Sequence, residues 1–168
     1  PFQHVSDPVL KKMNRKITRK EIEATMARVR RKLSDVAWRT TFIVGFPTET
    51  DQDFEELVDF VSEGHFQHLG IFLYSDEDNI RSSKFGDPIP LSLKEERKNR
   101  LMEIQQKISR EHHQKMVGSL QQVLVGGFSS ETDLLLEGRN QYQGPEVDGV
   151  VYINEGNAHS AGFHQVEI

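Results

Sequence analysis

The sequence has no cysteine among its 168 residues, and several other features are missing as well. Without cysteine a disulfide framework is excluded, although the cellular compartment is not thereby identified. No apolar run approaches the roughly twenty residues that a helix needs to cross a bilayer. A signal peptide, an internal repeat and a glycine-rich phosphate loop are also not visible. These absences argue against a disulfide-rich domain, a membrane-spanning protein and a phosphate-binding barrel enzyme.

The seven histidines are dispersed and do not predict a metal site. His65 and His68 have a spacing that could seat a metal, but no third ligand stands near them in the sequence. His112 and His113 are adjacent, so on a helix their side chains point in different directions. We interpret all four as surface histidines.

The composition is that of a globular cytoplasmic protein, with 28% charged and 36% hydrophobic residues. The net charge of −5 is unevenly distributed along the chain. Ser119 to Ile168 contains seven acidic residues and a single basic residue, Arg139, whereas the preceding part is nearly neutral. This asymmetry indicates a boundary near Gly118. Nucleic-acid affinity depends on cationic side chains, so the acidic segment suits a basic protein partner better.

The segment from Arg39 to Phe54 predicts a strand, a turn and a helix in succession. Its run Phe42-Ile43-Val44 has no polar alternation, which is typical of a parallel strand covered on both faces. Gly45 then lets backbone or a ligand come close, and Thr50 with Asp53 approximates a capping box. This order indicates an α/β fold, either a β/α barrel or a doubly wound sheet. Active sites of barrels lie at the carboxyl ends of the strands.

Further helices and strands are predicted on both sides of this segment. Ser6 or Asp7 can cap a short helix with Pro8 at its first position, and Thr18 with Glu21 predicts another capping box. Leu69 to Tyr74 predicts a second buried strand, and Pro1 to His4 the end of an earlier one. The helical positions expected to be buried are Ile22, Met26, Val29, Leu33, Phe54, Leu57, Val58 and Val61.

A long loop from Asp76 to Pro90 precedes a highly charged helix. Ser92 and Glu95 predict its capping box, and Gly118 its C-terminal cap. Its narrow apolar stripe consists of Leu101, Ile104 and Ile108. Short β-rich runs separated by glycine, serine and asparagine then predict a small antiparallel barrel. These runs are 121–125, 134–137, 149–153 and 163–168.

Two motifs in the first half resemble the methylthiotransferases of the radical S-adenosylmethionine superfamily. Ile43 to Thr50, reading I-V-G-F-P-T-E-T, is similar to that family's signature I-V-G-F-P-G-E-T. Pro1 to Asp7, followed by Leu10, Met13 and Arg15, is similar to its segment P-x-Q-H-x-S-D…L-x-x-M-x-R.

The resemblance extends along essentially the whole chain. Leu69 to Ser75 resembles the family's next strand, and Pro145 to Tyr152 resembles the branch that modifies an aspartate of ribosomal protein S twelve. Two departures stand out. Thr48 replaces a glycine, so the turn must have ordinary backbone angles there, since a β-branched residue resists positive φ. The loop from Glu77 to Ser82 differs from the family's E-E-G-T-x-A, which leaves its role in substrate choice open.

The resemblance implies a fold, a set of cofactors and an incomplete chain. Residues 1–90 would form the C-terminal half of a radical S-adenosylmethionine β/α barrel, 91–118 a linker helix, and 119–168 part of an OB-like TRAM domain. The cofactors would be S-adenosylmethionine and two 4Fe-4S clusters. Iron–sulfur clusters need cysteine thiolates, which this sequence lacks. We therefore expect it to be the C-terminal part of a longer enzyme and to be inactive alone, with no catalytic or metal-ligating residue of its own.

The resemblance also suggests residues that bind S-adenosylmethionine. Arg39 would pair with its carboxylate, and Gln3 and Ser6 would hydrogen-bond its nucleoside. From the residues alone, Arg39 is equally a strand-end residue that reaches solvent, and Ser6 a helix cap. An apolar wall against the adenine would consist of Ile43, Val44, Phe72 and Leu73, which are otherwise core residues.

The hypothesis is therefore a fragment of an aspartate methylthiotransferase that acts on a basic ribosomal protein. Glu146 and Asp148, in the most branch-specific motif, are the candidate partner-binding residues. A tRNA methylthiotransferase on the same scaffold is the alternative, which the acidic tail and the P-E-V-D-G motif disfavour. A non-catalytic partner-binding module is the alternative of a different class. No membrane association is expected.

Overall fold

The computed structural model describes residues 1–77 and 82–168. They fall into two compact units, Pro1–Glu111 and His112–Ile168, and each unit has its own hydrophobic core. Among the described residues, no helix has the length and apolar character that a membrane span requires. The chain is thus a mixed α/β protein whose two units are each built around buried apolar residues.

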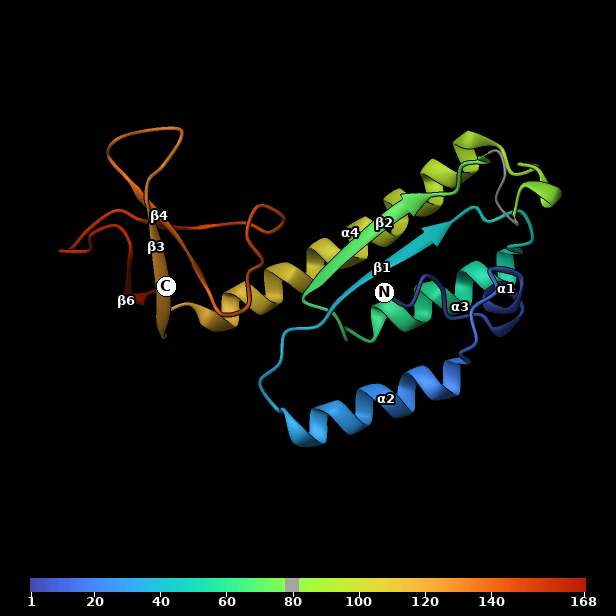
Figure 1. Ribbon diagram of the computed structural model, residues 1–168, viewed down its shortest axis with the longest axis horizontal. Coiled ribbons are helices and arrows are strands. Elements are labelled where there is room, and N and C mark those ends of the chain that lie inside the picture. Colours follow the sequence, from blue (N-terminus) through green and yellow to red (C-terminus); the bar gives the residue numbers. More distant parts are fainter. Residues whose placement is uncertain (78–81) are drawn as a thin grey trace. The chain divides into compact units, whose positions relative to one another are not determined.

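The first unit contains a small parallel sheet with helices packed beside it (Figure 1). Strands β1 (Arg39–Val44) and β2 (His68–Leu73) pair in parallel and in register along their whole length. On the other edge of β1, Gln3 forms an isolated parallel bridge with Phe42. The two predicted strands are confirmed, and the segment before α1 does lie next to them as an earlier strand would.

Among the residues that the structure describes, four α-helices and one 3₁₀ turn accompany the strands. Thr18 and Glu21 cap α2, and Thr50 and Asp53 cap α3, each by the reciprocal hydrogen bonds of a capping box. Both capping predictions are confirmed. The helices are α1 (Asp7–Lys12), α2 (Arg19–Lys32), α3 (Asp51–Ser62) and α4 (Leu91–Met116), and the 3₁₀ turn spans Ser83–Phe85.

Three predictions about helix ends are wrong. Helix α4 begins at Leu91, so Ser92 lies inside its first turn and does not cap it. Pro8 is the second residue of α1, not the first, and Ser6 makes no capping bond although it holds the N-cap position. Helix α2 ends at Lys32, which leaves Leu33 58% exposed instead of buried.

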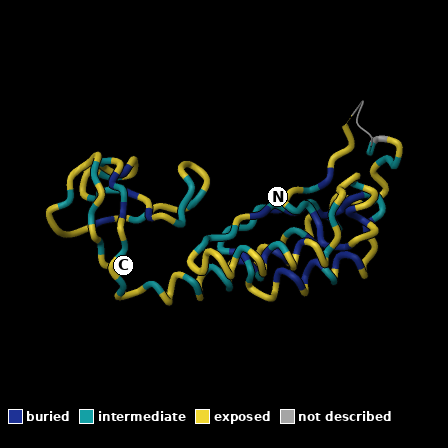
Figure 2. The backbone as a smooth tube through the Cα atoms, turned by 60° about the horizontal axis from the view of Figure 1, so that its bottom comes forward, coloured by how far each residue is buried: buried dark blue, intermediate teal, exposed yellow. Residues whose placement is uncertain are grey.

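The core of the first unit lies between one face of the sheet and the helices (Figure 2). Phe42 and Val44 of β1 and Ile71 of β2 point into it. The helical residues buried there are Leu10, Ile22, Met26, Phe54, Leu57, Val58, Phe60, Val61 and Leu101. The stripe predicted for α3 is confirmed.

The other face of the sheet is not covered to the same degree. Exposed or half-buried residues alternate with buried ones along β1, and Phe72 of β2 is 62% exposed. The expectation of a strand covered on both faces therefore holds only in part, because Ile43 is half-buried against a second cluster of Val9, Phe46 and Tyr74, whereas Arg39 is exposed. The sequence of β1 did not reveal the unequal burial of its two faces, because Ile43, which faces away from the main core, is as apolar as its neighbours.

The second unit is a four-stranded antiparallel sheet with strand order β5-β4-β3-β6. Val123 and Val125 of β3 and Ile153 of β5 form its small core. Gly118, just beyond α4, has φ +79°, a conformation that favours glycine after a helix. The strands are β3 (Leu120–Phe128), β4 (Leu136–Asn140), β5 (Val151–Ile153) and β6 (Gly162–Glu167), close to the four predicted runs.

Candidate functional site

The turn after β1 is organised by a buried glutamate. Gly45 has φ +74°, and Glu49 folds back so that its Oε2 accepts hydrogen bonds from the N–H groups of Gly45 and, at 3.1 Å, Phe46. The side chain of Glu49 is fully buried. The carboxylate therefore fixes the direction of two backbone amides at the carboxyl end of β1. Thr48 has no positive φ, as the sequence predicts.

Two further buried side chains face this carboxylate. Arg97 Nη1 of α4 lies 3.4 Å from Glu49 Oε2, and its Nη2 donates to Asp51 Oδ1 at 2.6 Å. His4 Nδ1 accepts from the N–H of Ser6 at 3.0 Å, which directs His4 Nε2 to Glu49 Oε1 at 3.8 Å. Three segments distant in sequence thus meet around one charge. A buried carboxylate needs such partners, because an unpaired charge is costly in the interior.

Lys94, one turn earlier on α4, is a second cation that bonds groups at the end of a strand. Its ammonium donates to the carbonyl oxygen of Tyr74 at 2.8 Å and to Asp87 Oδ2 at 2.6 Å. Its stem lies over Gly45, where an added Cβ would come within 2.8 Å of Lys94 Cδ and closer still to Cγ. The close approach predicted at Gly45 is real, and it is made by a lysine side chain.

Ser6 is engaged with α3. Its hydroxyl donates to Asp53 Oδ1, while Asp53 Oδ2 accepts from the N–H and, at 2.6 Å, the hydroxyl of Thr50. Burial of Asp53 opposes its ionisation, but the hydrogen bonds from Ser6 and Thr50 outweigh that effect and lower its pKa. Ser6 therefore ties the end of the first strand segment to the start of α3.

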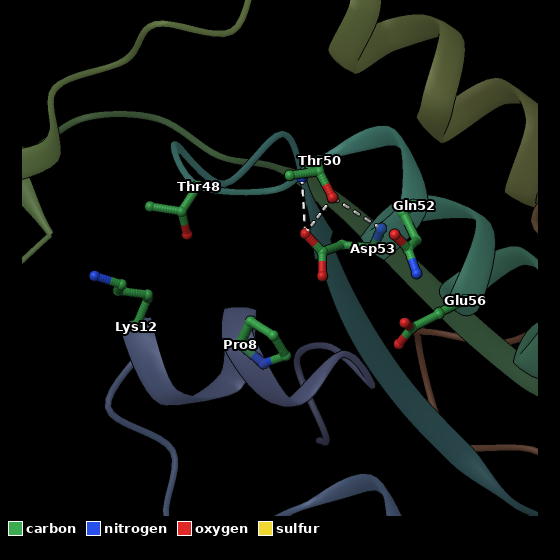
Figure 3. Close-up of a pocket in the computed structure, with 7 residues that line it drawn as sticks. All are labelled: Pro8, Lys12, Thr48, Thr50, Gln52, Asp53 and Glu56. Carbon is green, nitrogen blue, oxygen red and sulfur yellow. Dashed lines mark hydrogen bonds between the residues drawn. The ribbon is translucent and has the colours of Figure 1, made fainter.

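A pocket of about 390 Å³ opens beside this junction (Figure 3). Carboxyl groups of Asp53 and Glu56 border it together with the cation Lys12, and Asp53 already accepts the bonds that cap α3. The carboxylates of Asp53 and Glu56 would repel an anion, so the pocket is a poor phosphate site. Its lining residues are Pro8, Lys12, Thr48, Thr50, Gln52, Asp53 and Glu56.

The structure brings three of the predicted cofactor-binding residues together. Ile43 and Phe72 are paired across β1 and β2, so their side chains share one face of the sheet. Gln3 lies beside them, since its carbonyl oxygen accepts from the N–H of Ile43 at 2.9 Å. The exposure of Phe72 is unusual for a large apolar residue in a parallel strand.

The other predicted residues lie elsewhere. Val44 is fully buried in the helix-covered core, and Leu73 packs against the same core. Ser6 is buried and bonded to Asp53. Arg39 is at the amino end of β1, four residues or roughly 13 Å before Ile43, although the pleat places both on the same face.

The two acidic candidates of the second unit lie in the loop between β4 and β5. Glu146 is exposed and has φ +64°. Asp148 Oδ2 accepts from the N–H of Gly144 at 2.6 Å, and Gln143 Nε2 donates to the carbonyl oxygen of Gly149 at 2.7 Å. Asp148 therefore shapes this loop, whereas Glu146 presents its charge at the surface.

The sequence reasoning did not find His4, Glu49, Lys94 or Arg97. Glu49 and His4 stand inside the motifs quoted above, so their place at the end of a strand was a usable signal. Lys94 and Arg97 gave none, because cations on a highly charged helix are ordinarily solvated. Among the described residues, no group of three or more histidine, cysteine or acidic side chains is arranged to hold a metal ion.

Comparison with known proteins identifies both units. Residues 1–61 match the family model of the radical SAM superfamily, and residues 117–168 match that of the TRAM domain. The whole chain is 50% identical to part of the ribosomal protein uS12 methylthiotransferase RimO of Bdellovibrio bacteriovorus, covering 37% of that protein. The same-named protein of Geobacter sulfurreducens is 44% identical over the whole chain, with 38% of it covered.

A third relative gives the same result. The protein of that name from Aquifex aeolicus is 47% identical over 153 residues, which are 91% of this chain and 35% of the relative. The chain thus spans little more than a third of the curated relatives that it matches. The chain is thus similar over its length to one part of these methylthiotransferases, with a radical SAM match in its first unit and a TRAM match in its second.

Proposed function

We propose that the protein containing this chain is a methylthiotransferase that modifies an aspartate of ribosomal protein uS12. The supporting observation is a sequence identity of 44–50% to curated proteins of that name, which extends over the whole chain and therefore over both units. In that reaction an unactivated C–H bond of the aspartate is replaced by a C–S bond carrying a methyl group. The acidic second unit suits a basic protein substrate better than tRNA. We place the reaction in the cytoplasm.

We further propose the arrangement of domains within that enzyme. Residues 1–90 contribute the C-terminal half of the β/α barrel, 91–118 a connecting helix, and 119–168 part of an OB-like TRAM domain. The parallel pairing of β1 with β2 and the bridge from Gln3 to Phe42 support three adjacent barrel strands. The antiparallel sheet of the second unit supports an OB-like module.

The exposed face of the sheet fits S-adenosylmethionine. Phe72 and Ile43 offer an apolar wall for the adenine, and Gln3 stands beside them as a hydrogen-bonding partner for the nucleoside. Bound S-adenosylmethionine supplies the methyl group and the means of removing a hydrogen atom from the substrate carbon. In this proposal Ser6, Val44 and Leu73 support the apolar wall from the side of the sheet opposite the cofactor, because each is packed or bonded on the helix-covered side.

Arg39 remains the proposed partner of the cofactor's carboxylate. It lies on the same face as Ile43, and a ligand that reaches both must extend over roughly 13 Å along the strand. An arginine suits this role because its guanidinium can hold a carboxylate through two parallel hydrogen bonds.

The iron–sulfur clusters do not fit the residues of this chain. Cluster ligation needs cysteine thiolates, and the sequence contains none. We therefore assign no residue here to either cluster, and no part of the proposed chemistry is derived from them.

Binding of S-adenosylmethionine to the full-length protein tests the assignment of this face. Phe72→Ala and Arg39→Ala should each weaken binding by roughly tenfold in calorimetry, through loss of apolar contact and of a charge-assisted pair respectively. Phe128→Ala is the matched control, because Phe128 is 67% exposed on a strand of the second unit. Unchanged affinity in both variants of the first unit would remove this face from the cofactor site.

A further inference from the structure

We propose that Lys94 and Arg97 of α4 are positioning residues that hold the carboxyl ends of β1 and β2 in the form that binds the cofactor. This inference rests on the proposed function only for the identity of the cofactor, S-adenosylmethionine. Neither residue belongs to the motifs that carry the family resemblance, and neither lies on the exposed face with Phe72. They act through other groups, so neither is a catalytic residue.

Lys94 holds the end of β2. Its side chain is 3% exposed, and its ammonium bonds the carbonyl oxygen of Tyr74, the first residue after β2. The same ammonium pairs with Asp87, which fixes the segment leading into α4. Its stem fills the space above Gly45, so one side chain contacts the ends of both strands.

Arg97 holds the end of β1 through Glu49. Its side chain is 4% exposed and lies against Glu49 and Asp51. Glu49 in turn accepts the N–H groups of Gly45 and Phe46, and His4 approaches its other oxygen. Without the guanidinium, Glu49 would be a buried charge whose one remaining cationic partner among the described residues is a protonated His4. Its hold on the two amides would then weaken.

The two residues act together because of their spacing. Three residues apart on a helix, they lie on one face, and while Lys94 contacts the ends of both strands, Arg97 acts on the end of β1. Both terminal contacts are to backbone groups immediately after the strands: the carbonyl oxygen of Tyr74, and, through Glu49, the amides of Gly45 and Phe46. A helix that served only to cover the core would need apolar residues at these positions, where methionine would fit.

The test uses Lys94→Met and Arg97→Met in the full-length protein. Methionine retains most of the stem but removes the charge and the hydrogen-bond donors. The matched control is Arg100→Met on the same helix, because Arg100 pairs with Glu55 in an exposed bidentate contact. Amide hydrogen exchange over residues 44–49 and 73–76 reports the strand ends, and calorimetry reports the affinity for S-adenosylmethionine.

We expect both variants to lose roughly tenfold or more in amide protection at the strand ends and in cofactor affinity, whereas the control retains both. Adding Glu49→Gln to Arg97→Met should recover part of both losses, since glutamine keeps an acceptor without the unpaired charge. Rescue of this kind distinguishes positioning from mere loss of packing.

The proposal is overturned if the strand-end amides exchange as in the wild type, or if the losses equal those of Arg100→Met. A wild-type protein that binds no S-adenosylmethionine would contradict the proposed function. The exchange measurement would still decide whether Lys94 and Arg97 hold the strand ends.

Discussion

At the scale of single residues, Gly45 combines two constraints that usually occur apart. Its φ of +74° disfavours any side chain, and Lys94 occupies the place of a Cβ. Gly64 has φ +72° with open space around it, so it carries only the first constraint. The difference between alanine substitutions at these two glycines measures the contact with Lys94.

We predict that Gly45→Ala destabilises the first unit by clearly more than Gly64→Ala. The left-handed conformation should cost about 1–2 kcal/mol at each position, with a further cost at Gly45 from displacing Lys94. Urea unfolding followed by the fluorescence of Trp38, the only tryptophan of the chain, provides the comparison. Equal losses would mean that Lys94 moves aside without cost.

Ser6 and Asp53 provide a prediction that depends on pH. Ser6→Ala removes a buried hydrogen bond to a carboxylate, so it should cost roughly 1.5–3 kcal/mol near neutral pH. Ser62→Ala is the control, because the hydroxyl of Ser62 donates to the carbonyl oxygen of Val58 in its own helix, which carries no charge.

The pH dependence follows from the lowered pKa of Asp53. A carboxyl group with a lowered pKa in the folded state stabilises that state above its ordinary pKa of 3.8, and the stabilisation is lost as pH falls through the lowered value. Since Ser6→Ala raises this pKa, its cost should shrink on acidification below that range. A cost that is independent of pH down to the acid transition would show that Asp53 is not stabilised by Ser6.

The sequence predicted which strand residues are apolar but not which face each of them occupies. Ile43 and Val44 are adjacent and equally apolar, yet the first is half-buried on the less covered face and the second lies in the main core. Strand alternation implies that they differ, but only packed helices show which one is covered. For the same reason Phe72 and Leu73 were grouped together although they lie on opposite faces.

At the scale of elements, α4 shows that a sequence pattern does not predict which charged residues of a helix are buried. Its charged residues read as a solvated surface, and Arg100 fits that interpretation. Lys94 and Arg97, however, are buried because their partners come from loops 7 to 48 residues away. Pairing over such distances in sequence cannot be read from helical periodicity. By contrast, the capping boxes of α2 and α3 were predicted correctly, because all their partners lie within three residues.

In the loop between β4 and β5, Glu146 and Asp148 have different roles, although the sequence analysis made both of them candidates for partner binding. Because Asp148 bonds the N–H of Gly144, Asp148→Lys should disturb the loop itself. Glu146→Lys alters the surface charge alone, so we predict that it slows association with a basic protein partner at low ionic strength and leaves the thermal midpoint nearly unchanged.

Stopped-flow association with purified ribosomal protein uS12 at low and high salt checks this expectation. The reversal of Glu146 should matter less as salt screens the charge. An association rate that does not respond to the reversal at low salt would exclude Glu146 from the docking surface.

At the scale of the whole molecule, the proposed function makes this chain one part of an enzyme. In that proposal the chain contributes a face for S-adenosylmethionine and an acidic module for a basic partner, while its sequence has no cysteine for a cluster. The fold class followed from the alternation of strands and helices and from the change in charge near Gly118. The proposed substrate follows only from resemblance, because composition and periodicity carry no information about which protein is modified.

The central claim is that the protein containing this chain methylthiolates ribosomal protein uS12, and intact-mass spectrometry tests it most directly. Purified uS12 would be incubated anaerobically with the full-length, cluster-loaded protein, a reductant, a sulfide source and S-adenosylmethionine. The account predicts a mass increase equal to one methylthio group in place of one hydrogen, located by fragmentation on an aspartate. Unmodified uS12, together with methylthiolation of tRNA under the same conditions, would contradict it.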